Sequence, residues 1–259
     1  MKIGILAIVG VALLKAAVLS NDARTIIQRS VAANERDWKA APQYNYQERD
    51  RTGKGTKTYQ VLMILGSPYN RLVARDGRAL PASQQADEQR KLNAEIQRRR
   101  SESPAKRAAR IQRYRDGRRQ EHLMISQLTE AFDFHLTGQR TIGNHEVYVL
   151  EATPRAGYRP PNRDSKVLTG MRGELWVDTQ TFQWVKVEAE VIHRVSIGGF
   201  LAVVEPGTRF EVEYTPVDEG IWLPSHYTMS AHAKVFYLVS HTNQEDETYF
   251  GYQKAAPLS

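Results

Sequence analysis

The residues of this sequence that could carry acid–base chemistry stand in pairs along its predicted strands. Glu188 and Glu190 are two residues apart, and so are Glu211 and Glu213. In a β-strand this spacing places both carboxylates on one face, where they could serve as a general acid and a general base. The same spacing suits ion pairs with Lys and Arg residues of neighbouring strands. We interpret the pairs as solvent-facing members of such ion pairs and not as a catalytic site.

Metal binding and covalent catalysis lack their usual residues. His226 and His232 project the same way from one predicted strand, but they lie about 20 Å apart, too far to share a metal whose ligand bonds are about 2 Å long. The chain has no cysteine, which removes thiolate ligands, cysteine nucleophiles and disulfides. It also lacks Gly-x-Ser-x-Gly, His-Glu-x-x-His and a glycine-rich phosphate loop. We expect no enzyme activity, no cofactor and no metal, and keep an enzyme on an unrecognised β scaffold as the last alternative.

Apolar side chains offer a different chemistry, the burial of an apolar ligand. Ligand pockets are mostly apolar, with few polar groups. Ordinary core packing requires the same residue types on the dry side of a sheet, and the two interpretations differ only in whether space is left unfilled. The candidates for lining such a cavity are Tyr59, Val61, Met63, Tyr148, Leu150, Leu175, Val177, Val185, Val187 and Phe236.

These side chains belong to elements that the hydrophobic spacing predicts. Residues 21–38 have the spacing of a helix, and residues 44–50 and 56–65 predict a β-hairpin. From residue 132 onward, apolar and polar residues alternate as in strands with one dry side. In the strand 182–192 the residues expected on that side are Val185, Val187, Ala189 and Val191. A one-sided antiparallel sheet of this size must curl or be covered, so we predict an α+β fold with a curled antiparallel β-sheet covered by helices.

A basic helical insertion interrupts the strands between residues 81 and 131. It is rich in Ala, Gln, Glu, Lys and Arg, which form helices well, and Pro104 divides it in two. Residues 82–122 hold twelve Lys or Arg against six acidic residues, so this segment carries +6 of the formal net charge of +7. The residues predicted to contact a membrane or a partner protein are Arg98, Arg99, Arg100, Lys106, Arg107 and Arg110.

Three interpretations of this insertion stay open. Its charges could bind anionic lipid headgroups, could bind an acidic partner protein, or could belong to a solvated helical arm with ion pairs at helical spacing. Nucleic acid is not expected as a partner, because proteins that bind single strands use stacking aromatic side chains. Tyr114 is the only aromatic residue between residues 82 and 122.

The N-terminus predicts export from the cytoplasm. After a positive start, residues 3–14 are apolar or small, and residues 16–20 suit cleavage by signal peptidase, with Lys15 as an unusual charge between them. The alternatives are an uncleaved anchor and a buried N-terminal helix, and the apolar run is shorter than the ~20 residues of a membrane span. We predict a signal peptide or anchor at 1–20, a single domain at 21–259 and a periplasmic location.

Several strand and turn motifs resemble the outer-membrane lipoprotein-sorting family, the lipoprotein carriers with a LolA/LolB-like fold. The resemblance covers about residues 40 to 254, apart from much of the insertion. The segments that carry it are Phe134–Gly138, Val147–Pro154, Gly173–Asp178, Phe182–Glu188, Trp222–Ser225 and Glu247–Tyr252. The insertion is longer and more basic than the short lid helices expected of the plain carrier.

This resemblance implies a half-open antiparallel barrel whose hollow is closed by helices. In the carriers of that family the hollow holds acyl chains of lipoproteins that cross the periplasm, and relatives of the same fold sense envelope stress or bind other lipids. We therefore expect an envelope lipid- or lipoprotein-binding protein that shelters acyl chains between sheet and helices. The alternative is a non-catalytic envelope-stress or regulatory module that binds a protein partner. Expected partners are acyl chains and, in addition, an anionic membrane surface or an envelope protein.

Overall fold

The computed structural model describes residues 22–197, 202–235 and 239–256. The predicted export segment and the cavity candidate Phe236 lie outside these residues. The helices are α1 (Ala23–Ala40), α2 (Ala82–Arg100), α3 (Pro104–Ser126) and α4 (Leu128–Ala131), with short 3-10 helices η1 (Ala41–Gln43) and η2 (Asp164–Gly170). The strands are β1 (Tyr44–Thr52), β2 (Gly55–Ile64), β3 (Ser67–Arg75), β4 (Arg78–Ala79), β5 (Phe132–Ile142), β6 (His145–Pro154), β7 (Met171–Asp178), β8 (Trp184–Val191), β9 (Val195–Ile197), β10 (Ala202–Val204), β11 (Arg209–Asp218), β12 (Ile221–Val235) and β13 (Val239–Lys254).

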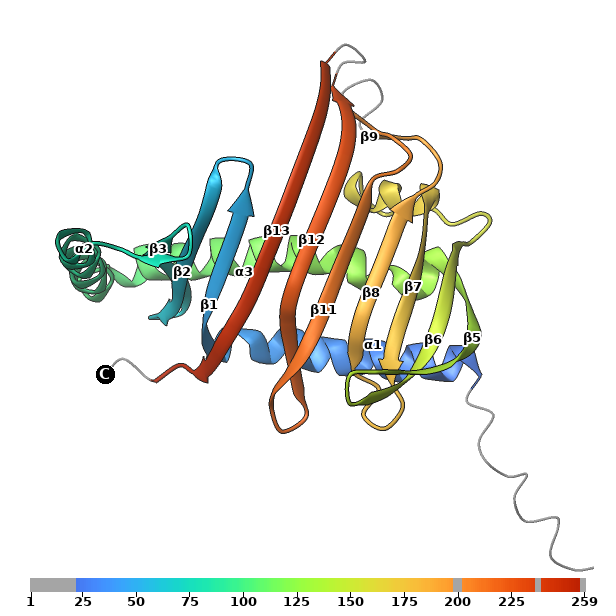
Figure 1. Cartoon of the computed structure of the whole chain (residues 1–259), viewed down its shortest axis with the longest axis horizontal. Coiled ribbons are helices and arrows are strands. Elements are labelled where there is room, and N and C mark those ends of the chain that lie inside the picture. The colour runs from blue at the N-terminus through green and yellow to red at the C-terminus, as the bar shows by residue number, and fades with distance from the viewer. Residues whose placement is uncertain (1–21, 198–201, 236–238, 257–259) are drawn as a thin grey trace, which may run out of the picture.

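One antiparallel sheet organises the described chain (Figure 1). Its strands follow the order β4-β3-β2-β1-β13-β12-β11-β8-β7-β6-β5, and the short β9 and β10 join it beside β12. The two end strands, β4 and β5, do not pair with each other, so the sheet stays open in the described part of the chain. The predicted fold class, a curled antiparallel sheet with helices and a helical insertion, is confirmed.

The helices cover one face of this sheet. In Figure 1, α1 and α3 cross behind the strands, and α2 stands beside β3 at one end. At the other end, α4 and η2 pack against β5, β6 and β7. We call the face that the helices cover the inner face, and the opposite one the outer face.

Local sequence signals set the ends of the two long cover helices. Asp22 caps α1, because its Oδ1 accepts a hydrogen bond from the backbone N–H of Thr25 at 2.7 Å. The helix ends just before Pro42, which cannot continue it. Ser103 caps α3 in the same way, accepting from the N–H of Lys106 at 3.3 Å, and Pro104 takes the first helical position. The predicted break in the insertion is confirmed.

Val185 does not share a face with Val187, contrary to the expected alternation. The pairing of β7 with β8 shifts between Trp176 and Val177, which is a β-bulge. The shift turns Val185 to the outer face, where it packs with Trp176. A change of one residue in register is enough to move a side chain across the sheet.

Candidate functional site

An apolar core lies on the inner face beneath α1. Ile26 and Ile27 of α1 contribute to it with exposed fractions of 0% and 3%. Below them, side chains of β6, β7 and β8 complete the cluster. The predicted cavity candidates that this core brings together are Tyr148, Leu150, Leu175, Val177 and Val187.

Beside this core the inner face has a small apolar cavity that is partly open to solvent. Its volume is about 60 Å³, and it lies between β5, β7, β8 and β11 on the sheet side and α4 and η2 on the helix side. That volume holds about two water-sized groups. The side chains that project into it from both sides include Leu128, Phe132, Phe134, Leu168, Met171 and Phe210.

Only part of this lining was predicted from the sequence. Leu175 and Val187 were candidates, and both line the cavity. Phe132 and Phe134 were not, although their spacing of two residues in β5 is the signal of a shared face. Leu168 of η2 lies in a segment with neither helical nor strand spacing, so no such signal was present for it.

The three candidates on β2 lie elsewhere. Six strands separate β2 from β6 in the order of the sheet. Val61 is buried at 2% exposed, whereas Met63 lines a separate hollow of about 450 Å³ together with Leu65 and Lys254. The structure therefore does not join Tyr59, Val61 and Met63 to the candidates on β6, β7 and β8.

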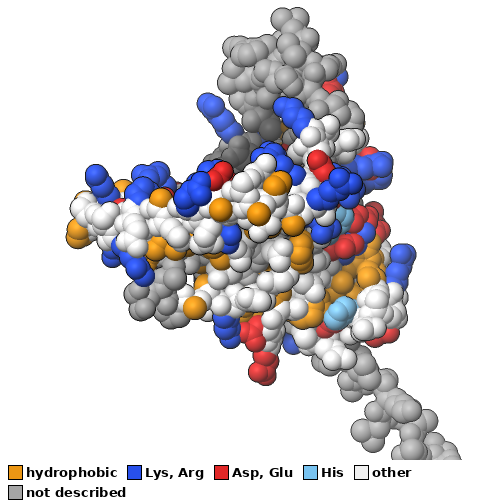
Figure 2. Space-filling view, turned by 60° about the vertical axis from the view of Figure 1, so that its left-hand side comes forward, with side chains coloured by type: hydrophobic (Ala, Val, Ile, Leu, Met, Phe, Trp, Pro, Cys, Tyr) orange, Lys and Arg blue, Asp and Glu red, His pale blue; other side chains and the backbone are white. Residues whose placement is uncertain are grey.

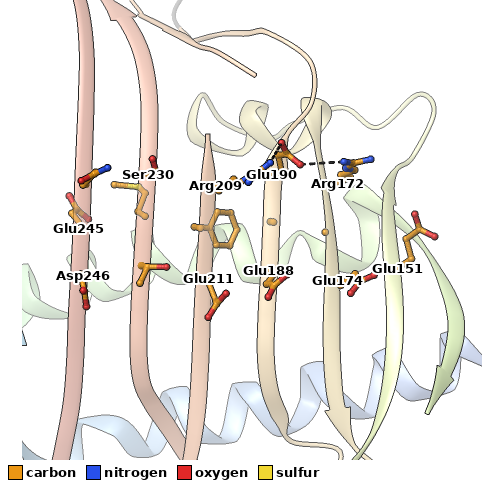
Figure 3. Close-up of a pocket in the computed structure, with 16 residues that line it drawn as sticks. Glu151, Arg172, Glu174, Glu188, Glu190, Arg209, Glu211, Ser230, Glu245 and Asp246 are labelled. Atoms are coloured by element: carbon orange, nitrogen blue, oxygen red, sulfur yellow. Dashed lines mark hydrogen bonds and ion pairs between the residues drawn. The ribbon is translucent and has the colours of Figure 1, made fainter. Parts of the chain in front are cut away.

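A larger hollow, of about 780 Å³, is lined by charged side chains of the outer face and also by Ala189, Phe210 and Met229, which alternate with them along the strands. Acidic residues of adjacent strands stand opposite one another across it, and Figure 3 shows them in a row. Thr228 of β12 interrupts the row. Its acidic members are Glu151, Glu174, Glu188, Glu211 and Asp246.

Ion pairs neutralise much of this outer surface. Lys186 Nζ lies 2.8 Å from a carboxylate oxygen of Glu188 and 3.0 Å from one of Glu211. In the next row, Glu190 accepts a hydrogen bond from Arg209 at 3.0 Å (Figure 3). The interpretation of the glutamate pairs as members of cross-strand ion pairs is confirmed. Because the acidic side chains of this hollow would lose water around an apolar chain, we place the candidate site at the smaller cavity, whose exposed lining is apolar.

Two of the six predicted contact residues of the insertion are turned inward. Arg99 is 5% exposed, and its Nη1 donates to the carbonyl oxygens of Ile64 at 2.8 Å and Ser67 at 2.7 Å. Its Nη2 donates to the carbonyl oxygen of Pro68 at 3.0 Å. Arg110 donates to Ser67 Oγ at 2.7 Å. These bonds fasten α2 and α3 to the turn between β2 and β3, so neither guanidinium is available to a membrane.

The remaining four predicted contact residues are exposed to solvent, and they differ in whether they form ion pairs. Arg98 forms ion pairs with Glu95 and Glu102. Hydrogen bonds from Arg98 and then Arg99 lower the pKa of Glu95 to about 2, against the opposing effect of burial. Arg100, Lys106 and Arg107 are exposed. The spacing of the arginines along the helices does not tell which of them point inward. The β2–β3 turn presents carbonyl oxygens to the helices, and a buried polar acceptor needs a donor, so the position of this turn decides which arginines are buried.

The inner face changes character beyond β11. Phe210 of the cavity lies opposite Met229 of β12, which lies opposite Glu245 of β13. Glu247 and Tyr249 follow Glu245 at two-residue steps and therefore share the inner face. We call β5, β6, β7, β8 and β11 the apolar half of the inner face, and β1, β2, β3, β12 and β13 its tyrosine–carboxylate half.

Glu48 is the central carboxylate of the tyrosine–carboxylate half. It lies opposite Tyr249 in the β1–β13 pairing and makes no hydrogen bond or ion pair with any residue that the structure describes. Burial, followed by the negative charges of Glu247 and Asp50, raises the pKa of Glu48 to about 7. The ring of Tyr46 lies beside it, with its centroid 6.0 Å from that of Tyr249.

A buried carboxyl group also holds α1 on the sheet. Asp37 Oδ1 accepts hydrogen bonds from the backbone N–H of Trp222 at 3.2 Å and from Gln183 Nε2 at 3.3 Å. Burial raises the pKa of Asp37 to about 6, although both hydrogen bonds oppose the shift. These contacts position the helix that closes the apolar half, and they explain why a carboxyl group is tolerated there.

Comparison with known proteins gives matches at the level of structure alone. No protein-family model and no curated protein matches the sequence. A LolA superfamily protein from Nitrosomonas europaea is 14% identical with a TM-score of 0.34, covering 92% of this chain and 95% of its own. An outer-membrane lipoprotein-sorting domain from Vibrio parahaemolyticus is 11% identical with a TM-score of 0.33, covering 90% and 93%. MucB of the Pseudomonas aeruginosa MucA/MucB complex is 13% identical with a TM-score of 0.24, covering 88% and 99%.

The matches include a LolA superfamily protein and a lipoprotein-sorting domain, so the resemblance predicted from the sequence motifs is confirmed. At such identities and TM-scores they carry no argument about what this chain binds. In the part of the chain that the structure describes, no helix has the length and apolar character needed to cross a membrane. The same residues contain no group of three or more His, Cys, Asp or Glu side chains placed to hold a metal ion.

Proposed function

We propose that this protein is a non-catalytic lipid-binding protein of the cell envelope that shelters an acyl chain in the apolar half of the inner face. The observation that carries the proposal is the unfilled apolar cavity between the sheet and α4 with η2. Its exposed lining is apolar, as in most pockets that bind apolar ligands. The export segment predicted at the N-terminus supports the envelope location.

The cavity marks where an acyl chain would enter, and its cover is weakly held. About 60 Å³ accommodates only a small part of a chain, so α4 and η2 must move away from the strands. α4 is a single turn of four residues, and so short a helix has little stability of its own. Tyr158 donates from its hydroxyl to Gln127 Oε1 at 3.2 Å, one of the polar contacts that hold α4 in place. Each methylene buried in the opened space contributes about 0.8 kcal/mol.

A substitution that fills the cavity tests the proposal. Ala189 of β8 lines the cavity, and Ala189→Leu adds three carbon atoms there. We expect uptake of a fluorescent fatty acid to weaken about tenfold, since each lost methylene contact costs about 1 to 3 kcal/mol. Ala231→Leu, on β12 and away from the cavity, is the matched control. Native mass spectrometry of gently purified protein with no bound lipid, together with no uptake of fatty acid, would contradict the proposal.

The second candidate is a regulatory module of the same fold that binds a protein partner and no cargo. The observation in its favour is the cavity volume, which is far below the several hundred Å³ usual for ligand pockets. For such a module the cavity is a packing defect, and Ala189→Leu should then raise the melting temperature while no lipid copurifies with the unmodified protein.

A further inference from the structure

The cavity on the inner face has a floor that crosses the strands. The register pairs Ala152 of β6 with Gly173 of β7, and Gly173 with Ala189 of β8. Phe134 of β5 continues this row at one end, and Phe210 of β11 continues it at the other. All five residues line the cavity. Since neighbouring strands lie about 4.8 Å apart, the floor runs about 19 Å across the sheet from Phe134 to Phe210.

Large apolar side chains form a wall on each side of this floor. In β7 the wall residues are Met171 and Leu175, which are 3% and 4% exposed. In β8 they are Val191 and Val187, each opposite one of these two. Every wall residue lies two positions from the floor residue of its strand and therefore on the same face. The space between the walls has the width of one row of side chains, and we call this floor with its two walls the furrow.

The floor of the furrow cannot be raised at its centre. A Cβ atom at Gly173 would lie 2.5 Å from the carbonyl oxygen of Glu188 and 3.3 Å from the Cβ atom of Ala189. Because the first distance is well below van der Waals contact, a side chain there would push β8 away. On the opposite side of the cavity, Leu128 of α4 and Leu168 of η2 cover the furrow.

The row of the floor carries no charged side chain between Phe134 and Met229. After Phe210 it continues through Met229 of β12 to Glu245 of β13, which is partly exposed. On the surface, by contrast, Figure 2 shows Lys and Arg side chains projecting from the molecule with hydrophobic side chains between them. A lipid in the furrow could therefore keep its polar end in water near β13, which avoids the cost of burying that end.

We propose that the furrow selects a single unbranched acyl chain, which lies across the strands with its methyl end beneath α4 and η2. This inference rests on the proposed acyl-chain site and names the kind of chain that fits it. A linear chain of methylene groups is as slim as one row of aliphatic side chains. A methyl branch would instead meet the buried walls at Met171 or Leu175, and extra carbon atoms beside well-packed side chains are costly.

Competition between a linear and a branched fatty acid tests the selectivity. Palmitic acid and phytanic acid, which carries methyl branches along a chain of the same length, are each used to displace a fluorescent fatty acid. We expect palmitic acid to bind at least about tenfold more tightly, since one extra methylene group in a hydrophobic pocket changes the discrimination about ten- to two-hundredfold. Equal affinities would overturn the selectivity and leave the acyl-chain site standing. No uptake of the fluorescent fatty acid would reject the site itself.

A wider furrow should lose this selectivity. Val187→Ala shortens one wall, and we expect the preference for palmitic acid over phytanic acid to fall about fivefold. The matched control is Val61→Ala, at a buried valine of β2 away from the cavity, and it should keep the preference of the unmodified protein. An unchanged preference in Val187→Ala, or an equal fall in both variants, would contradict the role of the walls.

Photo-crosslinking tests the direction of the chain on the unmodified protein, so that the result does not depend on the folding of a variant. Two forms of palmitic acid are compared, one with a diazirine at the end of the chain and one with a diazirine near its middle. We expect the terminal label to react at β5 and the middle label at β7 and β8, because the chain passes over one strand after another. Both labels on the same strand would mean that the chain runs along the strands, and would overturn the proposal.

Discussion

The two halves of the inner face are built from similar antiparallel strands but from different side chains. In the apolar half, Leu150 and Val177 are fully buried beneath α1, and an unfilled cavity lies beside them. In the tyrosine–carboxylate half, Glu48 is half-buried and has no partner among the described residues. An unpaired carboxylate is costly to bury and repels an apolar chain. The comparison teaches that only one half of this sheet is suited to an acyl chain.

The largest expected effect is a loss of stability in the tyrosine–carboxylate half that leaves the apolar half nearly unchanged. Arg99→Ala removes the donor that satisfies carbonyl oxygens of Ile64, Ser67 and Pro68. We expect the free energy of unfolding to fall by about 3 to 5 kcal/mol, because three carbonyl oxygens lose their buried donor, each at a cost of about 1 to 3 kcal/mol. Hydrogen exchange should speed up in β2 and β3 and change little in β6 and β7. Arg98→Ala, at an exposed side chain, is the control and should cost less than about 1 kcal/mol.

A leucine truncation in each half tests how firmly each is packed. Leu150 is 0% exposed in the apolar half, and Leu150→Ala should lower the free energy of unfolding by about 3 kcal/mol through lost burial and a new cavity. Leu72 of β3 is only partly buried, and Leu72→Ala should cost about 1 kcal/mol. Equal losses in chemical denaturation would remove the packing difference on which the comparison rests.

The smallest effect concerns the pH dependence of the tyrosine–carboxylate half. The pKa of Glu48 is raised to about 7 in the folded protein, so folding favours its protonated form. Its ionisation therefore destabilises the fold as pH rises above the unfolded value, near 4.5, and most fully above pH 7. Glu48→Gln should raise the free energy of unfolding by about 1 to 2 kcal/mol at pH 8, allowing for solvent screening. At pH 4 the same substitution should change the free energy of unfolding little. An equal gain at both pH values would contradict a raised pKa of Glu48.

The architecture could be predicted from the sequence because its signals are local. Alternating polarity placed Leu175 and Val187 on the inner face, and Pro104 marked the start of α3, as the structure confirms. The failures come from effects without a local signal. Val185 crosses to the outer face because of a bulge in the pairing with β7, and register shifts are not written in the spacing of one strand.

The candidate site was predicted less well than the fold. Leu128 and Leu168 come to the cavity from short helical elements whose packing depends on the whole sheet. Arg99 belongs to a run of three arginines, and only the tertiary position of the β2–β3 turn decides which of them is buried. Val61 has the right residue type and the right face, yet three strands separate its strand β2 from the nearest cavity strand, β11, because strand order follows from the topology of the complete sheet.

Photo-crosslinking with a fatty acid that carries a diazirine at the end of its chain tests the central claim most directly. Mass spectrometry of the crosslinked peptides reports which half of the inner face the chain reaches. We predict crosslinks to α4, β5 and η2, including Phe132 and Leu168 at the cavity, and their loss in Ala189→Leu. Crosslinks confined to β1 and β13, or none above the level of a denatured control, would contradict an acyl-chain site in the apolar half.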